Sequence, residues 1–269
     1  MKLMIQTTAI LIFTTAFLLG MPAQAQTNSV YSVNIVGFQQ AELDGPSKLF
    51  MMAAPFESGD QTLVDIFGTN SLVQSGTPAG ADKIRYWDNA EQKYVSVAQF
   101  QNVFYRLDAT GNYILPPLED NAVIPFGRGF WIDTSGSMSG ERAITLSGDV
   151  VLDEQMSVDI VPGLQIIAVP FSQGLALQDM SFLASGATAG SAPGGADQIR
   201  VWNVEEQQYT SYALFVNDGK WYRLDENDNW ELPPQEAVYT FSPGEAFWYF
   251  ARNSFTWTEE SPYANLTLD

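Results

Sequence analysis

A short sequence occurs twice in this chain with few changes: GADKIRYWD at residues 80–88 and GADQIRVWN at residues 195–203. Further pairs follow in the same order: QKY at residues 92–94 and QQY at 207–209, YRLD at 105–108 and 222–225, LPP at 115–117 and 232–234, and FW at 130–131 and 247–248. Matches that keep one order and nearly one spacing indicate a duplicated unit, whose length is that of a domain rather than a solenoid repeat.

The first residues of the chain predict export. Lys2 precedes an apolar run, Ala9–Leu19, and the small residues Ala23 and Ala25 follow. This is the layout of a secretory signal peptide, and the run is too short for a good membrane-spanning helix. The expected division is a signal peptide at residues 1–25, a first β repeat unit at 26–150 and a second at 151–269. We expect the mature chain in a periplasm, on a cell surface or in the extracellular medium, without membrane insertion.

Short strands separated by turns dominate each unit. Near-continuous apolar runs at residues 48–56 and 164–171 fit strands buried on both faces, and residues 83–97 have the pattern of strand, polar turn and strand. One short helix is expected in each unit, at Leu63–Phe67 and within residues 175–183. We therefore expect an all-β fold of two tandem homologous sandwich or small-barrel units, each with about six short strands.

The composition excludes several kinds of function. The chain carries a formal net charge of −19 and contains no cysteine and no histidine. Thiol catalysis, Ser-His-Asp catalysis and most zinc sites are therefore ruled out. An acidic surface repels phosphates and anionic lipids, so we expect neither nucleic acid nor membrane as a partner. Calcium is the one cofactor that this composition still allows, because carboxylates are its natural ligands.

Several short motifs occur in a recognisable order in the first unit: VNIVGF, MMAAPF, YWD, GRGFW and ITLSGDV. This order resembles a repeated β-module of exported bacterial proteins. The second unit departs from that pattern at Ala246, where the second glycine of the Gly-x-Gly-aromatic-Trp motif would stand. The resemblance implies secreted or cell-surface scaffolding with no general enzymatic activity, and it carries over no catalytic residue.

Four of the seven arginines and four aspartates are kept in both copies. In a chain with so few cations, retained arginines are expected to have fixed partners, since the planar guanidinium suits carboxylates. The residues expected in structural ion pairs are Arg85, Arg106, Arg200, Arg223, Asp82, Asp108, Asp197 and Asp225. Two equivalent ligand sites are the alternative interpretation.

The duplicated aspartates also offer an enzymatic alternative. A glycoside hydrolase needs two carboxyl groups separated by about 5–5.5 Å or about 6.5–9.5 Å, one of them with a raised pKa. Residues 225–229 (DENDN) look like part of a calcium loop as well, but Trp230 stands where such a loop requires glycine. We favour a hairpin turn there, and we expect no catalytic and no metal-binding residues.

Aromatic residues give the best positive indication of binding. Strand alternation places Phe130 and Ile132 on one face and Trp131 on the other, so this strand is apolar on both faces. The tryptophans that would form an exposed platform for a sugar ring or a protein partner are Trp131, Trp248, Trp221 and Trp230. Burial in the core is the alternative.

These patterns predict an exported, non-enzymatic structural or binding protein that recognises a glycan or a cell-surface protein. A glycoside hydrolase that uses paired carboxylates is the alternative function. The two copies of the opening sequence differ where Lys83, Tyr86 and Asp88 are replaced by Gln198, Val201 and Asn203. We expect any specialised function to lie at these positions.

Overall fold

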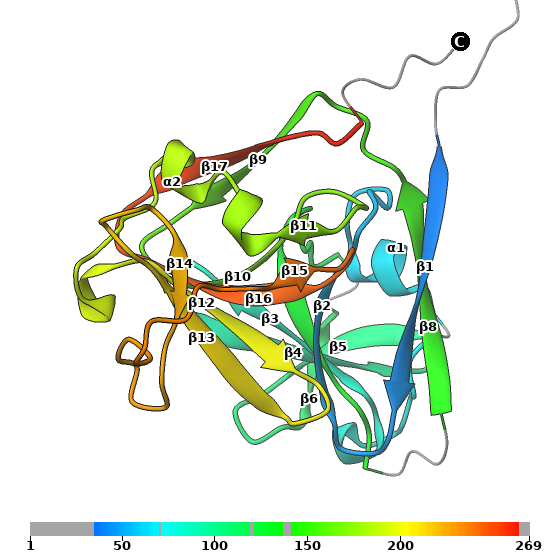
Figure 1. The fold of residues 1–269 in the computed structure, drawn as a ribbon. Helices are drawn as coiled ribbons and strands as arrows, with labels where there is room; N and C mark the ends of the chain where they lie inside the picture. Colours follow the sequence, from blue (N-terminus) through cyan, green and yellow to red (C-terminus); the bar gives the residue numbers. More distant parts are fainter. Residues whose placement is uncertain (1–34, 70, 119–120, 137–140, 264–269) are drawn as a thin grey trace, which may run out of the picture. The chain divides into compact units, whose positions relative to one another are not determined.

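The computed structural model describes residues 35–69, 71–118, 121–136 and 141–263, all within one compact unit, Asn34–Asp269. Within these residues the chain forms seventeen strands and two short α-helices (Figure 1), and the expected all-β fold is confirmed. The expected signal peptide lies outside the described residues. No helix of the described residues is long and apolar enough to span a bilayer.

The first half of the chain, up to residue 150, forms a six-stranded antiparallel sheet with the order β2-β7-β3-β4-β5-β6. Its strands are β2 (Leu49–Ala53), β3 (Lys83–Asp88), β4 (Lys93–Phe100), β5 (Val103–Leu107), β6 (Tyr113–Leu118) and β7 (Gly129–Asp133). Strand β6 contains Pro116 and Pro117 and forms one edge of the sheet. A separate two-stranded ribbon pairs β1 (Val36–Asp44) with β8 (Glu141–Asp149), and a 3-10 turn, η1 (Pro78–Gly80), precedes β3.

The second half forms a five-stranded antiparallel sheet with the order β10-β16-β12-β13-β14. Its strands are β10 (Gly163–Ala168), β12 (Gln198–Asn203), β13 (Gln208–Leu214), β14 (Trp221–Arg223) and β16 (Ala246–Ala251). A ribbon pairs β9 (Gln155–Ile160) with β17 (Phe255–Glu260), and a small sheet pairs β11 (Leu175–Ala176) with β15 (Thr240–Phe241). Two 3-10 turns, η2 (Leu177–Asp179) and η3 (Pro193–Gly195), complete this half.

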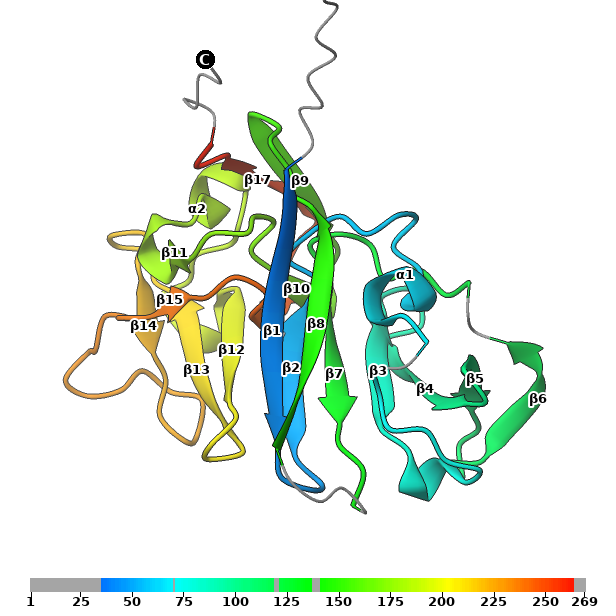
Figure 2. The same ribbon diagram turned by 90° about the vertical axis from the view of Figure 1, so that its right-hand side faces the viewer.

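The two halves use corresponding strands in the same order. The strand that carries the FW pair is β7 in the first half and β16 in the second. Strand β7 lies between β2 and β3, and β16 lies between the corresponding strands β10 and β12. In each half the first and last strands pair as a ribbon outside the main sheet (Figure 2). The expected division into two units at residues 150 and 151 stays a prediction.

Each half has its own hydrophobic core. In the first half, Phe130 and Ile132 of β7 pack with the ribbon and with helix α1 (Leu63–Phe67). Thr62 begins this helix, because its side chain accepts a hydrogen bond from the Asp65 N–H while the Asp65 carboxylate accepts one from the Thr62 N–H. In the second half the sheet packs in the same way against its ribbon and against helix α2 (Phe182–Ser185). Each half is therefore a two-layer arrangement of a sheet and a ribbon.

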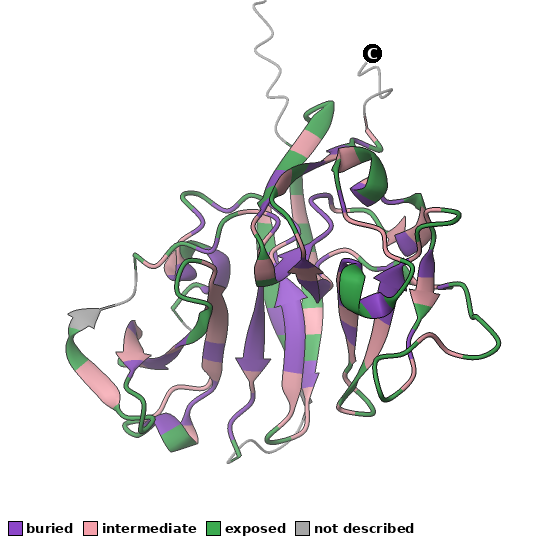
Figure 3. Cartoon of the chain, turned by 90° about the vertical axis from the view of Figure 1, so that its left-hand side faces the viewer, coloured by how far each residue is buried: buried purple, intermediate pink, exposed green. Residues whose placement is uncertain are grey.

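The opposite faces of the two sheets pack against each other. Met51, Ala53 and Trp131 of the first sheet form one buried cluster with Ile166, Ala168, Ala246 and Trp248 of the second. A Cβ atom on Gly129 would lie 2.4 Å from side-chain atoms of Ala246 and Ile166, so glycine permits this close approach. The central strands are consequently buried on both faces, as the purple segments of Figure 3 show.

Candidate functional site

The two aspartates of the repeated GAD sequence are fully buried and hold the main chain around the strand that follows. Asp82 accepts hydrogen bonds from the N–H groups of Val73 and Ser135 at 2.9 and 2.8 Å, and it forms an ion pair with Arg142. Asp197 accepts from the Arg252 N–H at 2.7 Å and from the Tyr249 hydroxyl at 2.8 Å. Burial raises the pKa of the Asp197 carboxyl, and these hydrogen bonds oppose the shift.

Three of the four retained arginines lie in ion pairs whose partners differ from the expected aspartates. Arg85 pairs with Asp133, Arg200 with Asp228 at 3.1 Å, and Arg223 with Glu231 at 3.6 Å. The reason is strand order, since β3 lies beside β7 and brings Arg85 next to the end of that strand. Arg106 lies on β5 and lines a cleft that is described below.

Asp108 and Asp225 each organise a hairpin turn. The Asp225 carboxylate accepts hydrogen bonds from the N–H groups of Asn227 and Asn229, both at 2.9 Å, and Asp108 binds those of Thr110 and Asn112 in the same way. These bonds lower the pKa of Asp108. The interpretation of residues 225–229 as a turn is confirmed. In the part of the chain that the structure describes, no group of three or more acidic side chains could hold a metal ion.

The four tryptophans expected on an exposed platform are packed instead. Trp131, Trp248 and Trp221 are only 3%, 7% and 2% exposed, and Trp230 is half-buried with its indole N–H bound to the Ser191 carbonyl at 3.1 Å. The platform prediction was wrong for the three buried rings. Trp131 and Trp248 lie between the two sheets, and Trp221 lies in the second core.

Packing between the sheets is reciprocal. Trp131 of the first half meets Trp202 of the second edge-on, with ring centroids 5.1 Å apart, and Trp248 of the second half meets Trp87 of the first at 5.0 Å. Tyr94 lies beside Trp87 and Tyr209 beside Trp202, at 5.0 and 4.8 Å. Edge-to-face contacts of this kind stabilise a fixed ring arrangement.

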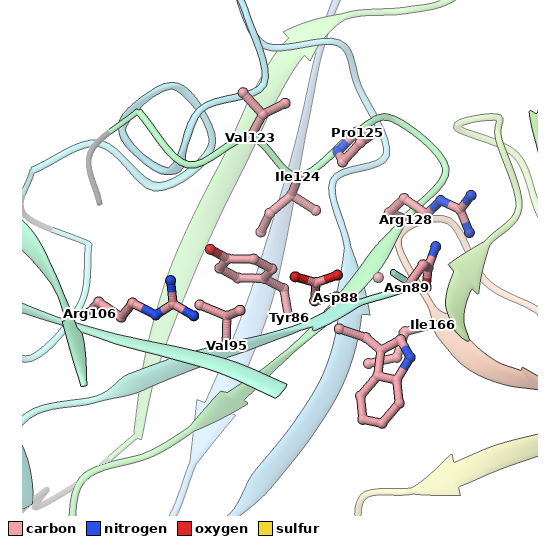
Figure 4. A pocket seen from close by; sticks show the side chains of 12 residues that line it. Tyr86, Asp88, Asn89, Val95, Arg106, Val123, Ile124, Pro125, Arg128 and Ile166 are labelled. Atoms are coloured by element: carbon pink, nitrogen blue, oxygen red, sulfur yellow. The ribbon is translucent and has the colours of Figure 1, made fainter. Parts of the chain in front are cut away.

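A cleft of about 380 Å³ opens at the edge of this aromatic packing, and we call it the Tyr86 cleft. Its lining residues are Tyr86, Trp87, Asp88, Asn89, Val95, Arg106, Val123, Ile124, Pro125, Arg128, Gly129 and Ile166. All except Ile166 come from the first half. Figure 4 shows Arg106 and Arg128 towards opposite ends of the lining, with Tyr86 and Asp88 between them. The cleft thus combines aromatic, aliphatic and charged side chains, as small-molecule sites in proteins commonly do.

Local structure explains why the charged groups stay in place. One carboxylate oxygen of Asp88 accepts hydrogen bonds from the Ala90 and Glu91 N–H groups at 2.9 and 3.0 Å, which fixes the turn after β3. The Arg128 guanidinium donates to the Gln165 side chain at 2.6 Å and to the Asp159 carbonyl at 2.5 Å. Burial lowers the pKa of Arg128, and the Asp159 carboxylate opposes that shift.

The corresponding place in the second half is packed with side chains. Counting from the shared FW pair, Tyr239 and Phe241 stand where Ala122 and Ile124 stand in the first half. The Phe241 ring is fully buried, and the Tyr239 ring lies 4.9 Å from it. Val201 belongs to the second core, whereas its counterpart Tyr86 is partly exposed. The two halves therefore carry different side chains at the Tyr86 cleft.

The sequence singled out some of these residues and missed others. Tyr86 and Asp88 were expected to carry specialised function, and both line the cleft. Arg128 and Ile166 were not identified as site residues. Arg128 corresponds to Glu245 in the second half, so the same comparison of copies could have found it. Ile166 comes from the other half, and no local pattern places it there. No family model, no curated protein and no solved structure matches the chain, so its function has to be inferred from this geometry.

Proposed function

We propose that this protein is an exported, non-enzymatic binding protein that recognises a carbohydrate in the Tyr86 cleft. The observation that carries the proposal is the convergence of Tyr86 and Trp87 with Asp88, Asn89 and Arg106 on one cleft. Aromatic rings pack on the apolar C–H face of a sugar, and carboxylate, amide and guanidinium groups bind its hydroxyls. Export is supported by the signal-peptide pattern at residues 1–25.

Binding has more support than hydrolysis at this place. Among the described residues that line the cleft, Asp88 is the one that carries a carboxylate. Asp82 and Asp197, which were candidates for a catalytic pair, are fully buried and bound to main-chain N–H groups. A glycosidase requires two carboxyl groups on either side of its substrate.

The proposal is tested by measuring saccharide binding on a glycan array and then by calorimetry. Tyr86→Val and Asp88→Asn replace two lining residues by those of the second half, and each should weaken binding about tenfold. Asn203 makes the same turn bonds as Asp88, to the Glu205 and Glu206 N–H groups at 2.9 and 3.0 Å. The Asp88→Asn change should therefore preserve the turn.

The exposed Asn203→Asp variant is the matched control and should bind as the unaltered protein does. Unchanged affinity in both Tyr86→Val and Asp88→Asn would overturn the Tyr86 cleft as the site. Turnover of chromogenic glycosides that is abolished by Asp88→Asn would favour the hydrolase. A blank array together with binding to a cell-surface protein would favour scaffolding.

A further inference from the structure

A second cavity, of about 280 Å³, lies beside the Tyr86 cleft, and we call it the aromatic cavity. Its lining residues are Trp87, Tyr94, Leu164, Arg200, Tyr209 and Trp248. Tyr94 and Tyr209 are each 41% exposed, so their rings are accessible from solvent. Both halves of the chain contribute to this cavity, and equivalent tyrosines lie on it.

The tyrosine hydroxyls keep their protons over a wide pH range. Burial raises the pKa of Tyr94 to about 12, and burial also raises the pKa of Tyr209. The Tyr209 hydroxyl accepts a hydrogen bond from the Trp248 indole N–H at 3.1 Å. The cavity therefore presents uncharged aromatic rings with polar tips, together with the Arg200 guanidinium.

Trp87 lines both cavities, and its indole N–H differs from that of its counterpart. In the second half, the Trp202 N–H donates to the Leu49 carbonyl at 2.8 Å. The Trp87 Nε1 atom is buried and has no hydrogen-bond partner among the described residues. Because this atom is closed to solvent, the Trp87 ring meets a ligand in either cavity through its carbon atoms.

Strand β10 passes along both cavities. Leu164 lines the aromatic cavity and Ile166 lines the Tyr86 cleft. These residues are two apart on one strand, so they share a face and are separated by about 7 Å. The two cavities therefore lie next to each other along β10, with Trp87 in the lining of both.

We propose that the aromatic cavity is a second saccharide position, so that the ligand is a chain of at least two sugar units with Trp87 between them. The Tyr94 and Tyr209 rings contact the second sugar, and the Trp87 ring borders both positions. This inference rests on the proposed function of the Tyr86 cleft. It adds that the protein distinguishes oligosaccharides from single sugars.

The test measures affinity against chain length. The probes are mono-, di- and tetrasaccharides of glucose, galactose, mannose, N-acetylglucosamine and uronic acids, first on an array and then by calorimetry for those that bind. We expect the disaccharide to bind about tenfold more tightly than its monosaccharide. Tyr94→Ala, which removes a ring, and Leu164→Trp, which fills the cavity, should bring this ratio close to one. Leu115→Trp, at a residue of β6 that is 70% exposed, is the control and should leave the ratio unchanged.

Two failures can be told apart. Equal affinity for mono- and disaccharides in the unaltered protein would overturn the second position and leave the Tyr86 cleft intact. Absence of binding by every saccharide would overturn the proposed function itself. Leu164→Trp enlarges a partly exposed side chain and leaves the hydrogen bonds between the Leu164 main chain and Gln92 in place. This variant therefore tests the inference even if Tyr94→Ala does not fold.

Discussion

The side-chain amide of Gln92 binds both main-chain groups of Leu164, a residue of the other half. Its oxygen accepts from the Leu164 N–H at 3.0 Å, and its nitrogen donates to the Leu164 carbonyl at 3.1 Å. Gln207 binds Leu49 in the same way, at 3.1 and 3.2 Å. Both glutamines follow the first strand of a repeated hairpin and have positive φ angles, 49° and 51°. The two halves are therefore joined by a reciprocal pair of amide contacts.

Removing one of these amides should destabilise the protein. We expect Gln207→Ala to lower the free energy of unfolding by about 1–2 kcal/mol, because two hydrogen bonds across the halves are lost. Urea denaturation followed by tryptophan fluorescence measures the change. Gln208→Ala is the matched control, since that exposed side chain bonds locally, to Glu206. Equal stability of the Gln207 and Gln208 variants would contradict the assignment.

Separated halves should not fold cooperatively. A chain of residues 26–150 alone would expose Trp131 and Met51, and it would lose the hydrogen bond from the Ala53 N–H to the Gly244 carbonyl at 2.8 Å. We expect this half to bind a hydrophobic dye and to show no sharp thermal transition, because the second sheet no longer packs on its inner apolar face. Mixing with residues 151–269 should restore the transition. A sharp transition of the isolated half at the temperature of the full chain would contradict this expectation.

Arg142 should matter far more to stability than Arg200. Arg142 pairs with Asp82, which is fully buried, so Arg142→Ala leaves a carboxylate without its charge partner and should cost about 3–5 kcal/mol. The pair of Arg200 with Asp228 is exposed, so Arg200→Ala should cost about 0–1 kcal/mol. Thermal melts of the two variants compare these costs. A larger loss for Arg200→Ala would show that the buried pair is not the stronger one.

The pH dependence of stability should carry opposite signs at two aspartates. Burial raises the folded-state pKa of Asp197, so its contribution is complete below about pH 4 and falls as the pH rises through the raised value. The cost of Asp197→Asn should therefore shrink between about pH 4 and about pH 7. Hydrogen bonds, first from the Thr62 side chain, lower the pKa of Asp65, so its contribution is complete above about pH 4 and the cost of Asp65→Asn should fall as the pH drops below that value. Urea denaturation at a series of pH values measures both, and slopes of the same sign would refute the assignments.

Local patterns predicted the first helix and the turn at residues 225–229, whereas the helix expected within residues 175–183 is a 3-10 turn followed by α2 (Phe182–Ser185). Helix α1 follows from the spacing of Leu63, Ile66 and Phe67, and the turn at residues 225–229 follows from an aspartate that binds the N–H groups ahead of it. In both cases the decisive contacts lie within a few residues along the chain. Sequence spacing determines such contacts directly.

Contacts between distant strands could not be predicted in this way. The partner of Arg85 depends on β3 lying beside β7, and the burial of Trp131 depends on the second sheet covering the first. The reciprocal amide contacts need two glutamines at positive φ, which is uncommon for that residue type. The sequence predicted the Tyr86 cleft in part. Comparison of the two copies identified Tyr86 and Asp88, but not the residues that surround them.

The two prolines of strand β6 bear on how this protein behaves in concentrated solution. An edge strand offers a row of free N–H and C=O groups on which another chain can add a strand and begin aggregation. Pro116 and Pro117 have no N–H groups to offer, so β6 is a poor template at those positions. Replacing both would create a longer hydrogen-bonding edge and should promote edge-to-edge oligomers.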